Sequence, residues 1–126
     1  MAGVAQKLLL KPAMVVARSG GEASWFEPLP PGARWTGDEQ RDEADAALLV
    51  VVTSDDLSAR LPLLQSRAAR DALTWVIYPK KGTVAGSDLT RDVIWRRLQG
   101  TGVRPVTQVA VTGVWSALRI RAGDDA

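Results

Sequence analysis

The residues available for chemistry in this chain are few in kind, because its 126 residues include neither His nor Cys. Without His, the chain lacks Ser-His-Asp catalysis and imidazole metal ligands. Without Cys, it lacks thiol nucleophiles, disulfides and thiolate metal sites. Adjacent acids such as Asp55 and Asp56 fit the first turn of a helix, where the helix dipole favours carboxylates. The sequence therefore predicts no catalytic residue and no metal site.

The stretch from Tyr78 to Trp95 has the spacing of a ligand-binding loop. A strand of the buried type ends at Tyr78, and Lys80 and Lys81 follow in a loop bounded by glycines. Loops that leave the carboxyl ends of parallel strands bind ligands in α/β folds. The two ammonium groups, with free amides at the start of the next helix, would hold an anion. A solvated turn is the alternative. The candidate anion site comprises Tyr78, Lys80, Lys81, Ser87, Asp88, Arg91 and Trp115.

A weaker candidate for cofactor binding lies after the first predicted strand. Gly20 and Gly21 follow that strand. Asp38 or Glu39 lies about 20 residues further along the chain, which is the spacing of the acid that binds the ribose in dinucleotide-binding folds. The pair is not a G-x-G-x-x-G motif, and no long helix follows to direct its N-terminus at a phosphate. A plain turn explains these glycines better. We therefore predict no cofactor and no useful affinity for S-adenosylmethionine.

The charge is unevenly distributed, although the formal net charge is only +2. Between Trp75 and Arg121, eight Lys or Arg against two Asp give +6, which leaves −4 for the rest. Such a field can steer an anionic partner to one side of a protein. Arginines on the outer face of a helix and of an edge strand are the plainer explanation, so nucleic acid is not the favoured partner.

The hydrophobic pattern alternates strands with helices. The run Ala46–Thr53 is continuously apolar, which predicts a central, parallel strand buried on both faces. Ser54 is the predicted N-cap of a helix that extends to about Arg70, and Pro62 is expected to bend or restart it. The other predicted strands are 13–17, 33–36, 73–78 and a hairpin of 106–112 with 114–120; the other predicted helices are 3–10 and one from Gly86 to a cap at Gly100 or Gly102.

These elements predict one three-layer α/β domain over residues 1–126, with a Rossmann-like, methyltransferase-like layout. Four mostly parallel strands and the C-terminal hairpin should form its sheet, and residues 122–126 a frayed tail. Trp75 and Trp95 are predicted to pack in the core, whereas Trp25 and Phe26 are predicted to be exposed. The longest wholly apolar run has seven residues, far below the roughly 20 that span a bilayer, so we expect a cytoplasmic protein.

The C-terminal half resembles a known family. The carriers of the resemblance are Tyr78-Pro79-Lys80-Lys81, Ser87-Asp88-Leu89-Thr90-Arg91-Asp92, Ile94-Trp95, Arg104-Pro105-Val106 and Trp115-Ser116-Ala117-Leu118-Arg119. These runs are similar to small bacterial proteins grouped as domain of unknown function 3052. The resemblance is specific over about residues 75–121 and loose over 7–74. It implies a small methyltransferase-like α/β domain without an established activity, and it supplies no catalytic residues.

Three functions remain open from the sequence. A non-catalytic binding or regulatory module with an unknown ligand is favoured, its partner a small anion or a protein. A small S-adenosylmethionine-dependent methyltransferase is the alternative, and nucleic-acid binding through the basic C-terminal half is the second alternative. We expect a monomer or a homodimer.

Overall fold

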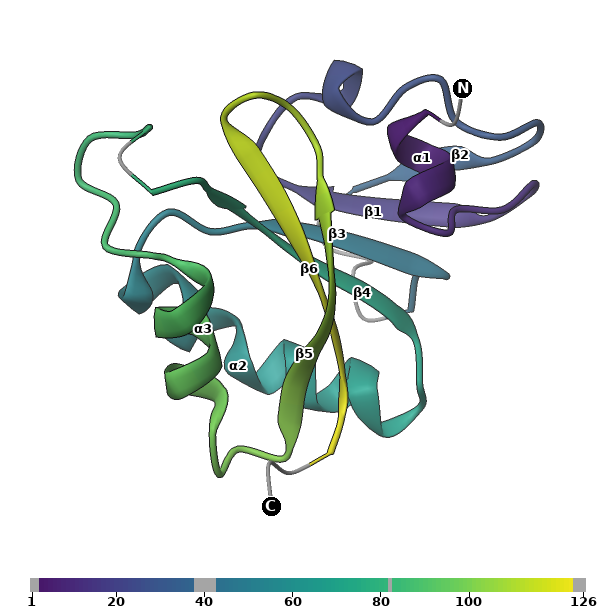
Figure 1. Cartoon of the computed structure of the whole chain (residues 1–126). Coiled ribbons are helices and arrows are strands. Elements are labelled where there is room, and N and C mark those ends of the chain that lie inside the picture. The colour runs from purple at the N-terminus through teal and green to yellow at the C-terminus, as the bar shows by residue number, and fades with distance from the viewer. Residues whose placement is uncertain (1–2, 38–42, 82, 124–126) are drawn as a thin grey trace.

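A single six-stranded sheet organises the chain, with the strand order β2-β1-β3-β4-β6-β5. The computed structural model describes residues 3–37, 43–81 and 83–123 (Figure 1). The strands are β1 (Val15–Ser19), β2 (Arg34–Thr36), β3 (Ala46–Val50), β4 (Leu73–Pro79), β5 (Val103–Ala110) and β6 (Trp115–Ala122). The helices are α1 (Val4–Lys7), the 3-10 turn η1 (Ala23–Trp25), α2 (Ser54–Ala69) and α3 (Arg91–Leu98).

The pairing of the strands confirms the predicted fold class. β2, β1, β3 and β4 run parallel to one another, whereas β6 is antiparallel to β4 and β5 is antiparallel to β6. The sheet is therefore four parallel strands extended by the C-terminal hairpin. The predicted central strand is also confirmed, because β3 pairs on both sides and its first four residues are fully buried.

Helices α2 and α3 cover one face of this sheet (Figure 1). The N-cap of α2 is Thr53, not the predicted Ser54: the Thr53 side chain accepts from the Asp56 amide, and the Asp56 side chain accepts from the Thr53 amide. This reciprocal capping box satisfies two amides that would otherwise lack partners. The helix continues through Pro62 without restarting, since Pro62 is on the solvent side and costs only one backbone hydrogen bond.

Helix α3 begins later than the sequence predicts. Its N-cap is Thr90, whose side chain accepts from the Val93 amide at 3.2 Å, so the predicted start at Gly86 is wrong. The residues from Gly86 to Leu89 form a loop instead, and Leu89 is buried although it lies outside the helix. The apolar spacing that suggested an earlier start therefore reflects burial of a loop residue and not helical geometry.

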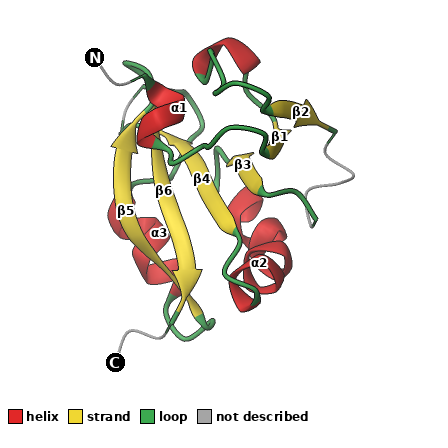
Figure 2. Ribbon diagram, turned by 90° about the vertical axis from the view of Figure 1, so that its right-hand side faces the viewer, coloured by secondary structure: helices red, strands yellow, loops and turns green. Residues whose placement is uncertain are grey.

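The opposite face carries a thinner layer, made of α1, η1 and the coil around them (Figure 2). Phe26 is completely buried there and Trp25 is half-buried, so the predicted exposed aromatic pair is wrong. Trp75 is buried as predicted and donates its Nε1–H to the Leu8 carbonyl at 3.0 Å. Trp95 is 39% exposed on α3, so its predicted packing in the core is wrong.

No helix in the described ranges is long and apolar enough to cross a membrane.

Candidate functional site

The strand order creates a topological switch point beside β1. From β1 the chain moves outward to β2, and it then returns to β3 on the other side of β1. The connections after β1 and β3 thus leave in opposite directions, and ligands of open α/β sheets bind outside the carboxyl ends of the strands at such a point. At this edge β1 ends in Ser19, followed by Gly20 and Gly21, and β3 ends in Val50.

The two glycines at the switch point are required by their backbone and by their neighbours. Their φ angles are +82° at Gly20 and +69° at Gly21, in the left-handed region. A Cβ atom at Gly20 would lie 3.1 Å from the Cβ of Val50. A Cβ atom at Gly21 would lie 2.7 Å from Cζ3 of Trp25. The Trp25 ring therefore covers Gly21, at the place where the backbone is open to a close approach.

Two arginines hold this loop from opposite sides. Arg18 donates from Nη1 to the carbonyls of Gly20 at 3.0 Å and of Gly21 at 2.7 Å. Arg60, on α2, donates to the hydroxyl of the buried Ser19. The Arg60 guanidinium thus places a positive charge at the carboxyl end of β1. Neither arginine was among the predicted site residues, because the sequence separates Arg60 from Ser19 by 41 positions.

The indole that covers Gly21 is stacked on a second indole. The Trp25 and Trp115 rings lie 4.9 Å apart between centroids, with an interplanar angle of 29°. This offset stacking is the geometry that aromatic pairs favour. Both side chains are half-buried. In the backbone register of β6 on β4, Trp115 pairs with Pro79, next to Tyr78. Its indole stacks on the Trp25 ring, which covers Gly21.

The N-terminus of α2, next to the switch point, is filled by the chain's own carboxylates. Asp88 accepts from the Ser54 amide at 2.8 Å and from the Ser54 hydroxyl at 2.7 Å. These two hydrogen bonds hold the pKa of Asp88 below its usual value. Asp56 accepts from the amides of Val52 at 2.9 Å and Thr53 at 3.1 Å. Asp88, expected as part of an anion site, is thus itself the anion at a helix N-terminus.

The predicted anion-site residues separate into small groups. Tyr78 is buried on the α2 and α3 face, where it hydrogen-bonds with Ser116 and lies near the Arg91 charge. Burial outweighs both contacts and raises the pKa of Tyr78, so its phenol stays protonated at neutral pH. Lys80 donates from Nζ to the Thr112 carbonyl at 3.1 Å.

The other predicted residues lie in the loop before α3 or at the surface. The Ser87 hydroxyl accepts from the Leu89 amide at 3.3 Å, which orders the loop before α3. Lys81 is exposed. Asp38, the weak ribose-binding candidate, lies outside the described residues. The hypothesis of an anion site around Lys80 and Lys81 stays a prediction.

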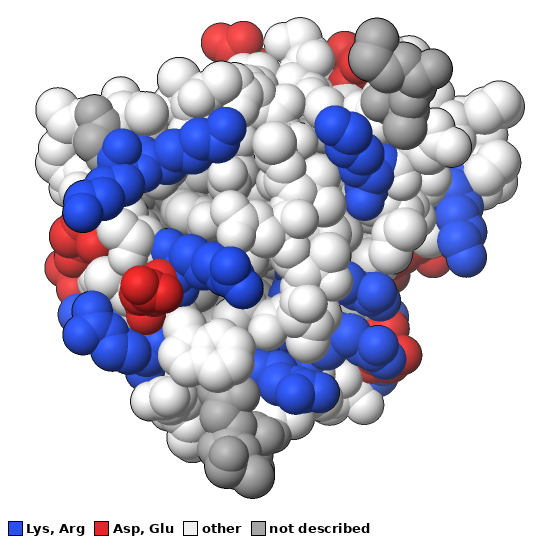
Figure 3. All heavy atoms as spheres, viewed as in Figure 1, with Lys and Arg blue, Asp and Glu red and all other residues white. Residues whose placement is uncertain are grey.

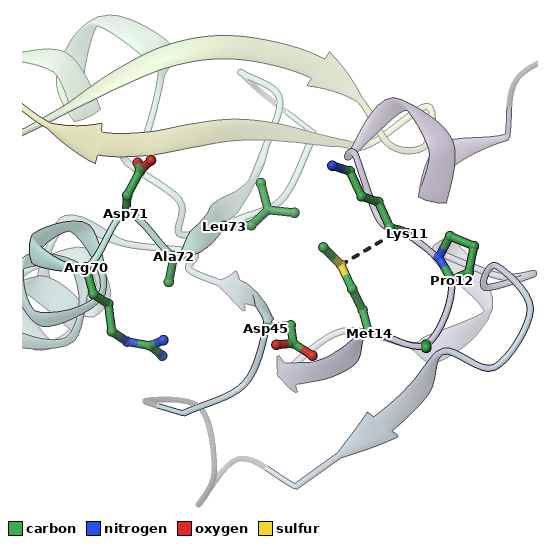
Figure 4. Close-up of a pocket in the computed structure, with 9 residues that line it drawn as sticks. Lys11, Pro12, Met14, Asp45, Arg70, Asp71, Ala72 and Leu73 are labelled. Carbon is green, nitrogen blue, oxygen red and sulfur yellow. Dashed lines mark hydrogen bonds between the residues drawn. The ribbon is translucent and has the colours of Figure 1, made fainter.

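A pocket of about 550 Å³ lies at the opposite edge of the sheet, beside the amino ends of the parallel strands (Figure 4). Arg70 and Asp45 point into it from either side, and Lys11 lies at its rim. Asp45 accepts from the Val15 amide at 2.8 Å, and Asp71 pairs with Arg121 at 3.1 Å. Because both carboxylates already have partners and the pocket lies away from the switch point, it is the weaker candidate.

Comparison with known proteins identifies the fold. No family model matches the chain, and no curated protein matches it. Among solved structures, it is similar to the mitomycin 7-O-methyltransferase MmcR, with a TM-score of 0.59, 17% identity, and coverage of 86% of this chain and 48% of that one. The chain thus spans about half the length of MmcR.

A second similar structure is a SAM-dependent methyltransferase from Aquifex aeolicus, with a TM-score of 0.61 and 13% identity. Here the match covers 91% of this chain and 85% of the other. At such identities the likeness concerns the fold alone. The chain has the Rossmann-like α/β fold that these methyltransferases share.

Proposed function

We propose that this domain binds S-adenosylmethionine at the carboxyl edge of β1 and β3 and acts as a small methyltransferase. The observation that carries the proposal is the glycine pair, Gly20-Gly21, at the switch point of a fold shared with a SAM-dependent methyltransferase. Backbone without side chains lets a ligand approach the end of β1 closely. The proposal replaces the non-catalytic module that the sequence alone favoured.

The residues around the glycines suit the chemical groups of this cofactor. Arg60 provides a fixed cation for an amino-acid carboxylate, and its bond to Ser19 holds the guanidinium at the edge of the sheet. The indole of Trp115 becomes an aromatic surface suited to a nucleoside base once Trp25 no longer stacks on it. S-adenosylmethionine, when bound, supplies an electrophilic methyl group on a positively charged sulfur.

The position of Trp25 sets a condition on binding. Its ring occupies the space above Gly21, and a ligand cannot share that space. Binding against Gly21 therefore requires Trp25 to leave Trp115, which costs the stacking contact, about 0.5–1.5 kcal/mol beyond the area buried. Removing the Trp25 ring should make binding no weaker.

Isothermal titration calorimetry with S-adenosylmethionine tests the proposal. We expect a Kd in the micromolar range for the unaltered chain and equal or tighter binding for Trp25→Ala. Arg60→Met should weaken binding about tenfold or more, since one charge-assisted hydrogen bond contributes about 1.4 kcal/mol or more. Arg96→Met, at an exposed arginine on α3, is the matched control and should bind normally. The absence of binding in both the unaltered chain and Trp25→Ala would refute the proposal.

A non-catalytic binding module is the second candidate, and one observation favours it. Trp25 covers Gly21 and Asp88 fills the N-terminus of α2, so side chains of the protein already occupy two places that a nucleotide would use. This function predicts no stabilisation by S-adenosylmethionine in a thermal-shift screen, together with stabilisation by another metabolite. A ligand at 100 times its Kd adds about 2.7 kcal/mol, which such a screen detects.

A further inference from the structure

Three arginines share one face of the hairpin formed by β5 and β6. Arg104 lies directly opposite Arg121, and Arg119, two residues before Arg121, lies opposite Thr107. Residues two apart on a strand point to the same side. Leu118 and Ile120, which alternate with the arginines, belong to the core beneath α2 and α3. The arginines therefore project from the other face of the sheet.

No helix of the described chain covers this part of the sheet. Figure 2 shows α1 in front of one end of β4 and β6. The other end of the hairpin, where β5 begins and β6 ends, stays open. Arg104 and Arg121 are exposed, and Arg119 is half-buried opposite Trp75. With Asp71 and Val106, Arg104 and Arg121 border a hollow of about 350 Å³.

The charge of this face is almost entirely positive. The hairpin from Val103 to Ala122 contains the three arginines and neither Asp nor Glu. Among the described residues, the acid recorded in contact with these arginines is Asp71, 3.1 Å from Arg121. Both partners are about half exposed, at 46% and 64%, so water and salt screen this ion pair and an incoming anion can compete for Arg121. Figure 3 shows more Lys and Arg than Asp and Glu on the side that β5 and β6 cross.

Arg119 is the best placed of the three to gain from an anion. Its Nε is buried and meets no hydrogen-bond acceptor within the described ranges. A guanidinium that has already lost part of its hydration is attracted to an anion more strongly than a fully hydrated one, because the local dielectric constant is lower. Arginine forks also bind phosphate oxygens in pairs, which lysine cannot do.

From these observations we propose that the open face of the β5–β6 hairpin binds the phosphate backbone of a single-stranded nucleic acid. Arg104, Arg119 and Arg121 are the phosphate contacts, and Thr107 adds a neutral hydroxyl donor of the kind that such contacts use. A duplex is disfavoured, because β6 also pairs with β4 and the hairpin is not a free ribbon that could enter a major groove. This proposal does not depend on the binding of S-adenosylmethionine.

Fluorescence anisotropy with a labelled 12-nucleotide oligouridylate, over a series of NaCl concentrations, tests this inference on the full chain. The double variant Arg104→Gln/Arg119→Gln leaves the Arg121–Asp71 pair intact. It should weaken binding about tenfold or more at low salt and reduce the slope of log K against log salt by about 1.4, at 0.7 for each lost contact. The matched control Arg96→Gln/Arg97→Gln removes two exposed charges from α3 and should leave the slope unchanged.

The outcomes separate the proposal from its alternatives. An oligodeoxythymidylate of the same length should bind with an affinity within about twofold, because the contacts are to phosphate. Equal losses in the two double variants would mean a diffuse charge effect and would overturn the proposal, as would undetectable binding by the unaltered chain or tighter binding of a duplex. If the double variant is misfolded by circular dichroism, Arg104→Gln alone, at an exposed position, serves instead with an expected slope change of about 0.7.

Discussion

Arg67 has no exposed surface, although it carries a permanent charge in the middle of the chain. Its Nε donates to the Thr74 hydroxyl at 2.9 Å, Nη1 to the Ala44 carbonyl at 3.0 Å and Nη2 to the Leu73 carbonyl at 2.8 Å. A buried charge is tolerated only when its donors are satisfied in this way. Arg67 therefore ties the end of α2 to the starts of β3 and β4.

Replacing Arg67 should destabilise the protein far more than replacing an exposed arginine. Arg67→Met keeps much of the side-chain volume but leaves two buried carbonyls without their donor, so we expect a loss of about 3 kcal/mol or more. Urea unfolding followed by circular dichroism measures this free energy. Arg96→Met on the surface of α3 is the control, with an expected change within about 0.5 kcal/mol. Similar losses in the two variants would mean that the Arg67 contacts contribute little.

Single residues differ in how far the sequence can predict their place. Trp75 was predictable because it lies inside a strand of continuously apolar residues. Arg67 and Arg60 were not, since their partners come from other elements and no local pattern encodes them. Phe26 was misplaced because glycines and prolines around it suggested an exposed loop, whereas the loop folds back onto the sheet.

Among the elements, strands and long helices were predictable and the thin layer was not. Continuous apolar runs identify β3 and β4, and the alternating pattern identifies the hairpin. The segment between β1 and β3 has no helical periodicity, and Pro28, Pro30 and Pro31 exclude a long helix, so its packing depends on tertiary contacts. The candidate site could be predicted only in part for the same reason. The glycine pair is evident in the sequence, but the packing of Trp25 over Gly21 depends on tertiary contacts.

The contact between the loop before α3 and the N-terminus of α2 should depend on pH. The hydrogen bonds from Ser54 lower the pKa of Asp88 from its ordinary value of 3.8. A lowered carboxyl pKa gives stability that is fully present above the ordinary pKa and is lost as the pH falls through the folded-state pKa. Asp88→Ala should therefore melt below the unaltered protein at pH 7, and this difference should shrink as the pH falls below about 4.

Differential scanning fluorimetry at pH 7, 5 and 3 measures this effect. Glu22→Ala is the control, because Glu22 is exposed and its side chain makes no capping hydrogen bond to η1. Its melting temperature should follow that of the unaltered chain at every pH. A difference for Asp88→Ala that stays constant down to pH 3 would show that the contact does not depend on the charge of Asp88.

In the whole molecule, one sheet separates two cores that differ in thickness. α2 and α3 build a helical layer over one core, whereas α1, η1 and coil close the other. The proposed cofactor site lies at the carboxyl edge of this sheet, and the arginine face lies where the thin layer leaves β5 and β6 open (Figure 2). The thinner layer thus bears on both candidate functions, because its Trp25 covers Gly21 at the cofactor site and because it leaves the arginine face of β5 and β6 uncovered.

The two cores should nevertheless unfold together, because β3 contributes neighbouring residues to both. Leu48 faces the thin layer and Leu49 faces α2 and α3, and both are fully buried. Leu48→Ala and Leu49→Ala should each cost about 2–5 kcal/mol, as buried leucines do when truncated.

Two spectroscopic signals report on the two sides of the sheet during urea unfolding. Tryptophan fluorescence reports mainly on the thin layer, where Trp25, Trp35, Trp75 and Trp115 pack, and far-ultraviolet circular dichroism reports mainly on α2 and α3. If the domain is two-state, either leucine variant should shift both signals to one common midpoint. If Leu48→Ala moved the fluorescence transition to lower urea and left the circular dichroism transition in place, the thin layer would open separately from the sheet. The strand that both cores share would then not make them one cooperative unit.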